Sequence, residues 1–83
     1  MPVLHIVNCR EALARCRDVV AEQDIVVLIE DGVYAAVEAM NGEFRVLDQD
    51  AKARGVASLV KHPLCSYEDF VALAAQHHPV VSW

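Results

Sequence analysis

The sequence feature that most constrains the fold is an unbroken apolar run, "IVVLI", preceded by Asp24 and ending at Ile29. A strand with one wet face alternates apolar and polar residues, whereas a continuous run is typical of a strand covered on both faces of a parallel sheet. Parallel neighbours must be joined by long crossovers, usually helices. The run therefore predicts an α/β domain with helices on both sides of a mainly parallel sheet.

Strand-like and helix-like segments alternate along the rest of the chain. We expect strands at residues 3–7, 24–29 and 44–47, a fourth at either 56–60 or the segment near Leu64, and an edge strand at 80–83. We expect helices at 10–22, 31–40, 48–55 and 67–77. In the first of these, apolar residues recur at three- and four-residue steps, namely Ala12, Leu13, Cys16, Val19 and Val20. The pattern predicts one small layered domain over residues 1–83.

Residues at the helix ends support these boundaries. Asn8 can cap the first helix and Asp48 the third, and Gly55 suits the C-terminal end of the third helix. Ser66 and Asp69 have the spacing of a capping box at the start of the last helix.

The composition favours a subunit over a self-sufficient monomer. The chain has 83 residues, of which 55% are hydrophobic and 23% charged. A domain of about 60 to 80 residues buries only about 60% of the surface that its unfolded chain exposes. We therefore expect part of the apolar surface to be covered by a partner chain.

Charge and hydropathy argue against several classes of protein. The net charge is −5 and no basic cluster is present, so direct binding to nucleic acid or to a membrane surface is not expected. The longest uncharged apolar run, Ile25–Ile29, is too short to span a bilayer, and the N-terminus lacks the features of a signal peptide. We expect a cytoplasmic protein. No nucleotide-binding fingerprint is present, so no cofactor is expected.

The central strand ends at Glu30, Asp31 and Gly32, where helices begin and where parallel sheets bind their ligands. Acids in the first turn of a helix favour its dipole and cap free N–H groups, and glycine permits a sharp turn or close packing. One glycine is no phosphate cradle, and two anions repel phosphate. A structural role is the favoured interpretation of this corner.

Four segments, in the same order along the chain, resemble the DsrH/TusB family. They are "LHIVN" at 4–8, "VVLIEDGVYAA" at 26–36, "VLDQDAKARGV" at 46–56 and "YEDFVALAAQHHPVVSW" at 67–83. The chain departs from the family pattern at Cys9, at Cys65 and in the short segment that carries His62 and Pro63.

The resemblance implies a DsrEFH-like fold and a subunit of a sulfur-relay complex. DsrE/TusD-like, DsrF/TusC-like and DsrH/TusB-like subunits typically form a heterohexamer with two copies of each. Such complexes pass persulfide sulfur toward 2-thiolation of the tRNA wobble uridine, or serve dissimilatory sulfur oxidation. The subunit of this type usually supports the assembly, while the DsrE/TusD-type subunit holds the principal sulfur-carrying cysteine. Some members are homo-oligomers, so a non-catalytic homo-oligomer remains an alternative.

Cys16 is the first candidate for a secondary sulfur acceptor. Sulfur transfer needs an accessible thiolate, and the position of Cys16 on the apolar stripe with Leu13 is typical of a buried small hydrophobe. The resemblance favours a role, because some DsrH-type members carry a cysteine fourteen residues before the Glu of the EDG motif. Cys16 keeps that spacing to Glu30, and Arg15 and Arg17 would favour its thiolate if it is accessible.

Cys9 is the rival candidate. It precedes a predicted helix and adjoins Arg10, and both helix N-termini and neighbouring cations favour the thiolate form of a cysteine. The resemblance gives it no role. Cys65 is expected to fill the core.

A metal site is not predicted. Histidine and cysteine ligands are available at His62, Cys65, His77 and His78. Adjacent histidines on a helix point in different directions, however, and the His62-x-x-Cys65 pair lacks a second close pair. The histidines are expected at the surface or as capping groups near a helix C-terminus.

Overall fold

The fold is that of a layered α/β domain, seen in a computed structural model that describes residues 2–83. Within this part of the chain the elements are β1 (Leu4–Val7), α1 (Arg10–Arg17), β2 (Ile25–Leu28), the 3-10 helix η1 (Glu30–Val37), β3 (Glu43–Leu47), α2 (Asp48–Ala53), β4 (Leu64–Cys65), α3 (Tyr67–Gln76) and β5 (Val80–Ser82). None of these helices is long and apolar enough to cross a membrane.

The five strands form one sheet in the order β4-β3-β2-β1-β5, and every pairing is parallel. The predicted fold class is therefore confirmed. The apolar run of β2 lies at the centre, between β1 and β3, which explains why both of its faces are apolar. Val7 pairs with Leu28, and Leu28 with Val46, so the carboxyl ends of β1, β2 and β3 reach the same edge of the sheet.

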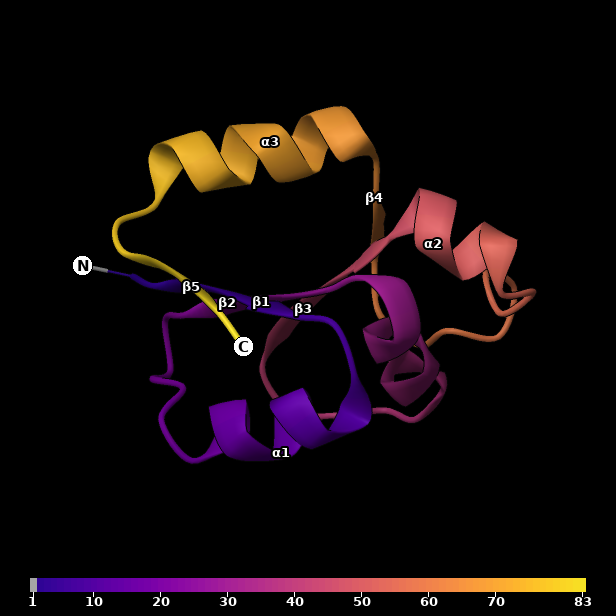
Figure 1. Cartoon of the computed structure of the whole chain (residues 1–83), viewed down its shortest axis with the longest axis horizontal. Helices are drawn as coiled ribbons and strands as arrows, with labels where there is room; N and C mark the ends of the chain where they lie inside the picture. Colours follow the sequence, from indigo (N-terminus) through magenta and orange to yellow (C-terminus); the bar gives the residue numbers. More distant parts are fainter. Residues whose placement is uncertain (1) are drawn as a thin grey trace.

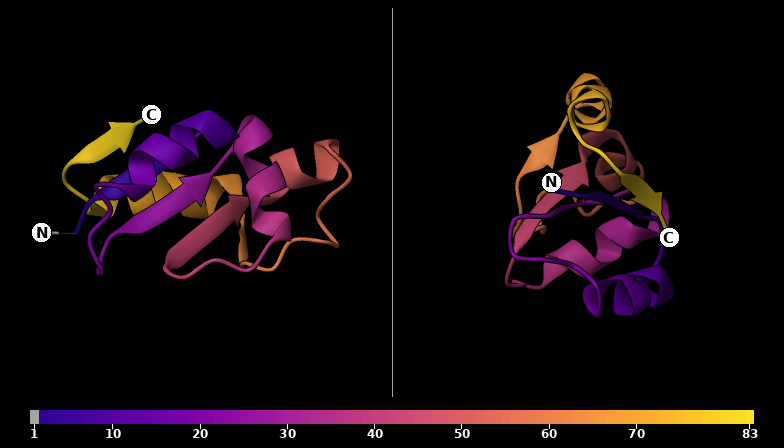
Figure 2. Two further views of the ribbon diagram at one scale, coloured as in Figure 1. Left: turned by 90° about the horizontal axis from the view of Figure 1, so that it is seen from below. Right: turned by 90° about the vertical axis from the view of Figure 1, so that its left-hand side faces the viewer.

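Helices cover the two faces unequally. In Figure 1, and edge-on in the right panel of Figure 2, α3 lies alone on one side of the sheet, while α1 and η1 lie on the other. α2 projects from the end of β3, beside η1. Side chains alternate between these two layers along each strand. Val26 and Leu28 enter the larger core on the α1 side, and Val27 enters the smaller core under α3.

The first helix is shorter than its sequence pattern predicts. It ends at Arg17 rather than residue 22, and Val19 is 58% exposed instead of facing the core. The prediction was wrong because the chain must turn back into β2: the backbone N–H of Ala21 donates to the carboxylate of Asp24 at 2.9 Å. The N-cap was also misplaced, since Cys9 and not Asn8 occupies it.

The second predicted helix, at 31–40, is a 3-10 helix that ends at Val37. Its buried residues Val33 and Ala36 are three positions apart, the spacing that one face of a three-residue turn requires. Residues 38–40 leave the helix and lead into β3.

The later elements resolve the remaining alternatives. The fourth strand is the segment at Leu64, while residues 56–60 form turns. Asp48 is the first residue of α2 rather than its cap, and Gly55 follows α2 with a φ of 71°, as a C-terminal glycine should. The capping box is confirmed, because the Asp69 N–H donates to Ser66 Oγ at 3.0 Å and the Asp69 carboxylate accepts from Ser66 N.

Candidate functional site

The corner after β2 is shaped by a close approach between backbones. A Cβ atom on Gly32 would lie 2.5 Å from the carbonyl oxygen of Val7, the last residue of β1. Only glycine fits there without moving the backbone. Glu30 has a φ of 47°, a left-handed conformation that is uncommon for a residue with a side chain. The corner is therefore a tight junction between β1, β2 and η1.

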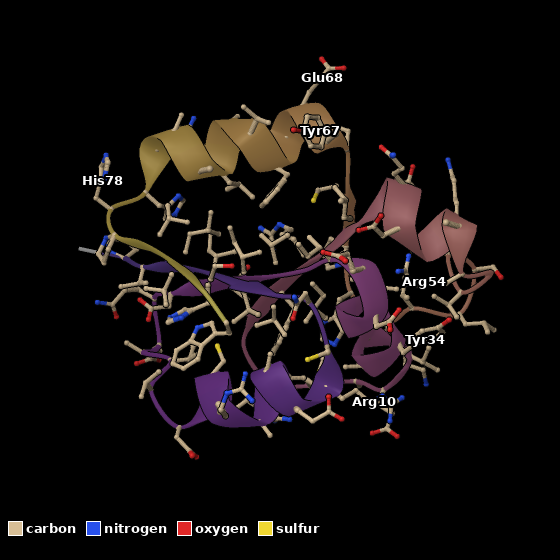
Figure 3. The ribbon with its side chains drawn as sticks, in the orientation of Figure 1. Arg10, Tyr34, Arg54, Tyr67, Glu68 and His78 are labelled. Atoms are coloured by element: carbon tan, nitrogen blue, oxygen red, sulfur yellow. The ribbon has the colours of Figure 1, made fainter. Side chains whose placement is uncertain are left out.

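Residues from α2 and its C-terminal end hold this corner in place. Asp50 accepts a hydrogen bond from the backbone N–H of Glu30 at 2.6 Å, and Arg54 Nε donates to Asp31 Oδ1 at 2.8 Å. That hydrogen bond also raises the pKa of Arg54. Figure 3 shows Arg54 beneath α2, on the side of η1. The sequence segments 26–36 and 46–56 therefore contact each other. Asp31, Asp50 and Arg54 stabilise this contact.

Two of the three thiols are buried. Cys16 is fully buried on α1, and burial, followed by the charge of Asp24, raises its pKa to about 11. Burial also raises the pKa of Cys65, with a smaller contribution from Asp69. Both groups are therefore neutral thiols near pH 7, and Arg15 and Arg17 do not change this. The expected core position of Cys65 is confirmed.

Cys9 is the most accessible of the three thiols. It is half-buried at the N-cap of α1, where its Sγ accepts a hydrogen bond from the Ala12 N–H at 3.4 Å. The neighbouring Arg10 reaches η1 instead, donating to the Tyr34 carbonyl oxygen at 3.3 Å; the two side chains lie near each other in Figure 3. Of the two candidate thiols, Cys9 is therefore the more accessible.

His62 and His77, two of the histidines considered above as metal ligands, form hydrogen bonds with backbone groups. His62 Nε2 accepts from the Met40 N–H at 3.1 Å, and His77 Nδ1 donates to the Leu73 carbonyl oxygen at 2.8 Å, near the end of α3. Across residues 2–83 no three His, Cys, Asp or Glu side chains are grouped to hold a metal ion.

A buried polar chain joins β1, the start of β2 and the C-terminus. Asp24 and His5 are 4% and 3% exposed, and His5 Nε2 lies 2.9 Å from Asp24 Oδ2. The Trp83 indole N–H donates to His5 Nδ1 at 3.1 Å. The Asp24 carboxylate also accepts from the backbone N–H groups of Val3 and Ala21, each at 2.9 Å.

These partners set the tautomer of the neutral His5 ring and keep Asp24 ionised. An indole N–H can only donate, so His5 Nδ1 is an acceptor, and the proton of the neutral ring is on Nε2, facing Asp24. Burial alone would raise the pKa of Asp24, but hydrogen bonds from His5, Ala21 and Val3 outweigh it and lower that pKa to about 2. Both ring nitrogens are occupied, so the pair is not free for acid–base chemistry on a substrate.

The sequence analysis missed this chain of hydrogen bonds. Its signal was present in a histidine inside the apolar strand "LHIV" and in the lone tryptophan at the C-terminus. Only the parallel register, which pairs His5 with Val81, brings these distant positions together.

Two shallow grooves flank α1. One, of about 250 Å³, is lined by Arg10, Leu13, Arg17 and Met40; the other, of about 380 Å³, by Arg17, Val20, Asp24 and Phe44. Neither is lined by a cysteine, so neither presents a thiol.

β4 and α3 carry three of the exposed large apolar side chains. Leu64, Tyr67 and Val71 are 42%, 60% and 48% exposed. Tyr67 and Val71 are four residues apart and so share one face of α3. Figure 3 shows Tyr67 and Glu68 at the start of this helix, with Glu68 directed away from the sheet.

Comparisons with known proteins agree with the fold and the motif order. A family model described as DsrH like protein matches residues 8–80. The solution structure of protein Tm0979 from Thermotoga maritima is similar, with a TM-score of 0.73 and 24% identity over 93% of this chain and 95% of that chain. A comparison with curated protein sequences finds no match.

Proposed function

Because the chain belongs to the DsrH-like family, which implies a subunit of a sulfur-relay complex, we propose that it is a mainly structural subunit of such a complex in the cytoplasm. Its partners are DsrE/TusD-like and DsrF/TusC-like subunits, assembled with it as a heterohexamer. The complex then supplies sulfur for 2-thiolation of the tRNA wobble uridine, and the chain itself does not contact the RNA.

The observation that carries this proposal is the incomplete cover of the α3 side. α3 contributes no fully buried residue, and two of its apolar side chains, Tyr67 and Val71, are 60% and 48% exposed. Apolar side chains exposed together on one helix face are typical of a surface that a partner covers. We name this pair, Tyr67 and Val71, the α3 patch.

The state of Cys16 favours the supporting role over direct sulfur transfer. A thiol with a pKa of about 11 has roughly one part in ten thousand as thiolate at pH 7, and this one is also buried. The alternative in which Cys16 accepts sulfur during dissimilatory oxidation requires the chain to open. In a homo-oligomer, a second copy of this chain would cover the α3 patch. Co-purification distinguishes that assembly from a heterohexamer.

Co-purification tests the assembly. When the chain is expressed with neighbouring DsrE-like and DsrF-like subunits, we expect elution as a larger complex. Val71→Glu should remove the chain from that complex. Val19→Glu is the matched control, because Val19 is also exposed, at 58% against 48% for Val71, but lies after α1. A homo-oligomer that ignores the other two subunits, or equal behaviour of the two variants, would contradict the proposal.

Persulfide loading tests the chemical role. After incubation with a persulfide donor, intact-mass measurement should show no added sulfur on Cys16, so Cys16→Ser should leave the spectrum unchanged. Any adduct should disappear in Cys9→Ser. A sulfur adduct that depends on Cys16 would instead favour the acceptor role.

A further inference from the structure

The C-terminal strand β5 lies at one edge of the sheet. Among residues 2–83 its strand partner is β1, and it is three residues long. Backbone hydrogen bonds flank both ends of β5. Before it, the Leu4 N–H donates to the Pro79 carbonyl oxygen at 3.2 Å; after it, the Trp83 N–H donates to the Ile6 carbonyl oxygen at 2.9 Å. The side-chain tie is the Trp83 indole, which packs on the His5 ring with centroids 6.1 Å apart and donates to its Nδ1.

We propose that the Asp24–His5–Trp83 chain is a pH-sensitive latch that holds β5 on the edge of β1. A second proton on His5 converts Nδ1 from an acceptor to a donor, so that two N–H groups face each other. A buried donor without an acceptor is costly. The indole must therefore leave, and β5 loosens with it.

The geometry directs the change to Trp83 rather than to His5. The Asp24 carboxylate stays ionised through mildly acid pH, since its pKa is about 2, and it is fixed by two backbone N–H groups. A doubly protonated His5 keeps its Nε2–H hydrogen bond to Asp24. The two side chains then form a full ion pair. Only the bond to Trp83 is lost, so opening is confined to the outer edge of the sheet.

Among residues 2–83, Asp24 is the charged side chain in ion-pair contact with His5, and Arg17 and Glu22 line a groove together with Asp24. β2 and β5 carry no acid or base, and the buried residues of α1 are Ala12, Leu13 and Cys16, of which only the neutral Cys16 thiol titrates. Asp24 is the charged group that faces the ring. Release of β5 would leave the edge of β1 free for another strand, which links the latch to assembly.

The test uses the single tryptophan of the chain. Its indole N–H gives one assignable NMR resonance, and the ring nitrogens of His5 report tautomer and protonation. We follow both from about pH 8 to about pH 5, the range in which histidines titrate. We expect the Nε2–H tautomer at the start. As His5 gains its second proton, protection of the Trp83 indole and amide should fall roughly tenfold or more, with β2 amides unchanged.

His5→Gln is the matched variant, because glutamine can donate to Asp24 and accept from Trp83 without titrating. It should keep β5 protected at every pH, whereas wild type and the His77→Gln/His78→Gln double variant should both show the transition. If His5→Gln does not fold, Trp83→Phe should show weak, pH-independent protection of β5. Protection that survives His5 protonation, an unfolding of β2 at the same midpoint, or a transition retained in His5→Gln would overturn the latch.

Discussion

The two faces of the sheet are completed to different degrees by this one chain. On the α1 side, twelve buried residues from α1, β1, β2, η1, β3 and the α2 region form the main core, and His5 and Asp24 are buried as well, with Trp83 partly buried against this core. On the α3 side only four residues are buried, and none belongs to α3. The difference teaches that most of the burial that stabilises the domain lies on one face, whereas the other face keeps exposed apolar surface, which the proposed assembly would cover.

A matched pair of leucines measures this separation. Leu28 is fully buried on the α1 side, whereas Leu73 of α3 is only partly buried. We expect Leu28→Ala to lower the free energy of unfolding by about 4 kcal/mol and Leu73→Ala by about 1–2 kcal/mol, since the cost follows burial and the cavity left behind. Urea unfolding of the isolated chain gives both values. Equal losses would mean that α3 seals its face as well as α1 does.

A second pair of substitutions compares the corner with an open turn. Gly32→Ala should destabilise by about 3 kcal/mol, because its Cβ would collide with the Val7 carbonyl oxygen. Gly55→Ala is the control: Gly55 has a φ of 71° but no atom within 4 Å of an added Cβ, so only backbone strain of about 1–2 kcal/mol is expected. If the two variants unfold at the same urea concentration, the junction at Gly32 is looser than its geometry indicates.

The sequence predicted this architecture well because its signals are local. An apolar run, a capping box and a C-terminal glycine each act within a few residues, and the parallel sheet follows from their alternation. The end of α1 was less predictable, because the apolar stripe continues through Val19 and Val20 while the chain is already turning toward Asp24. Here a local hydrogen bond across the turn, from the Ala21 N–H to the Asp24 carboxylate, accompanies the end of the helical periodicity.

The candidate site was predictable only in part. Spacing and resemblance identified Cys16, but its burial and raised pKa follow from the packing of α1 against the sheet and from the nearby Asp24. The buried chain of Asp24, His5 and Trp83 spans 78 positions between its last two members. No short-range pattern encodes such a contact.

The pH dependence of stability tests how tightly the α1 side holds Asp24. Its folded-state pKa of about 2 lies below the ordinary value of 3.8, so the contribution is complete above that value and is lost as the pH falls through 2. We expect Asp24→Asn to lose about 2 kcal/mol at pH 7 and to approach wild type near pH 2. Asp18→Asn, at the exposed end of α1, should stay within about 0.5 kcal/mol. A constant difference across this pH range would place the cost in packing rather than in the charge.

The smallest effect on stability is expected in the α3 patch. Val71→Glu should change the free energy of unfolding of the isolated chain by no more than about 0.5 kcal/mol, because the side chain is already 48% exposed. Val19→Glu should behave alike in the same urea titration. The two variants should differ only when partner subunits are present, since burying a carboxylate against an apolar partner is unfavourable. A large loss of stability for Val71→Glu alone would mean that α3 depends on this side chain to fold, and the division between a folding face and an assembly face would not hold.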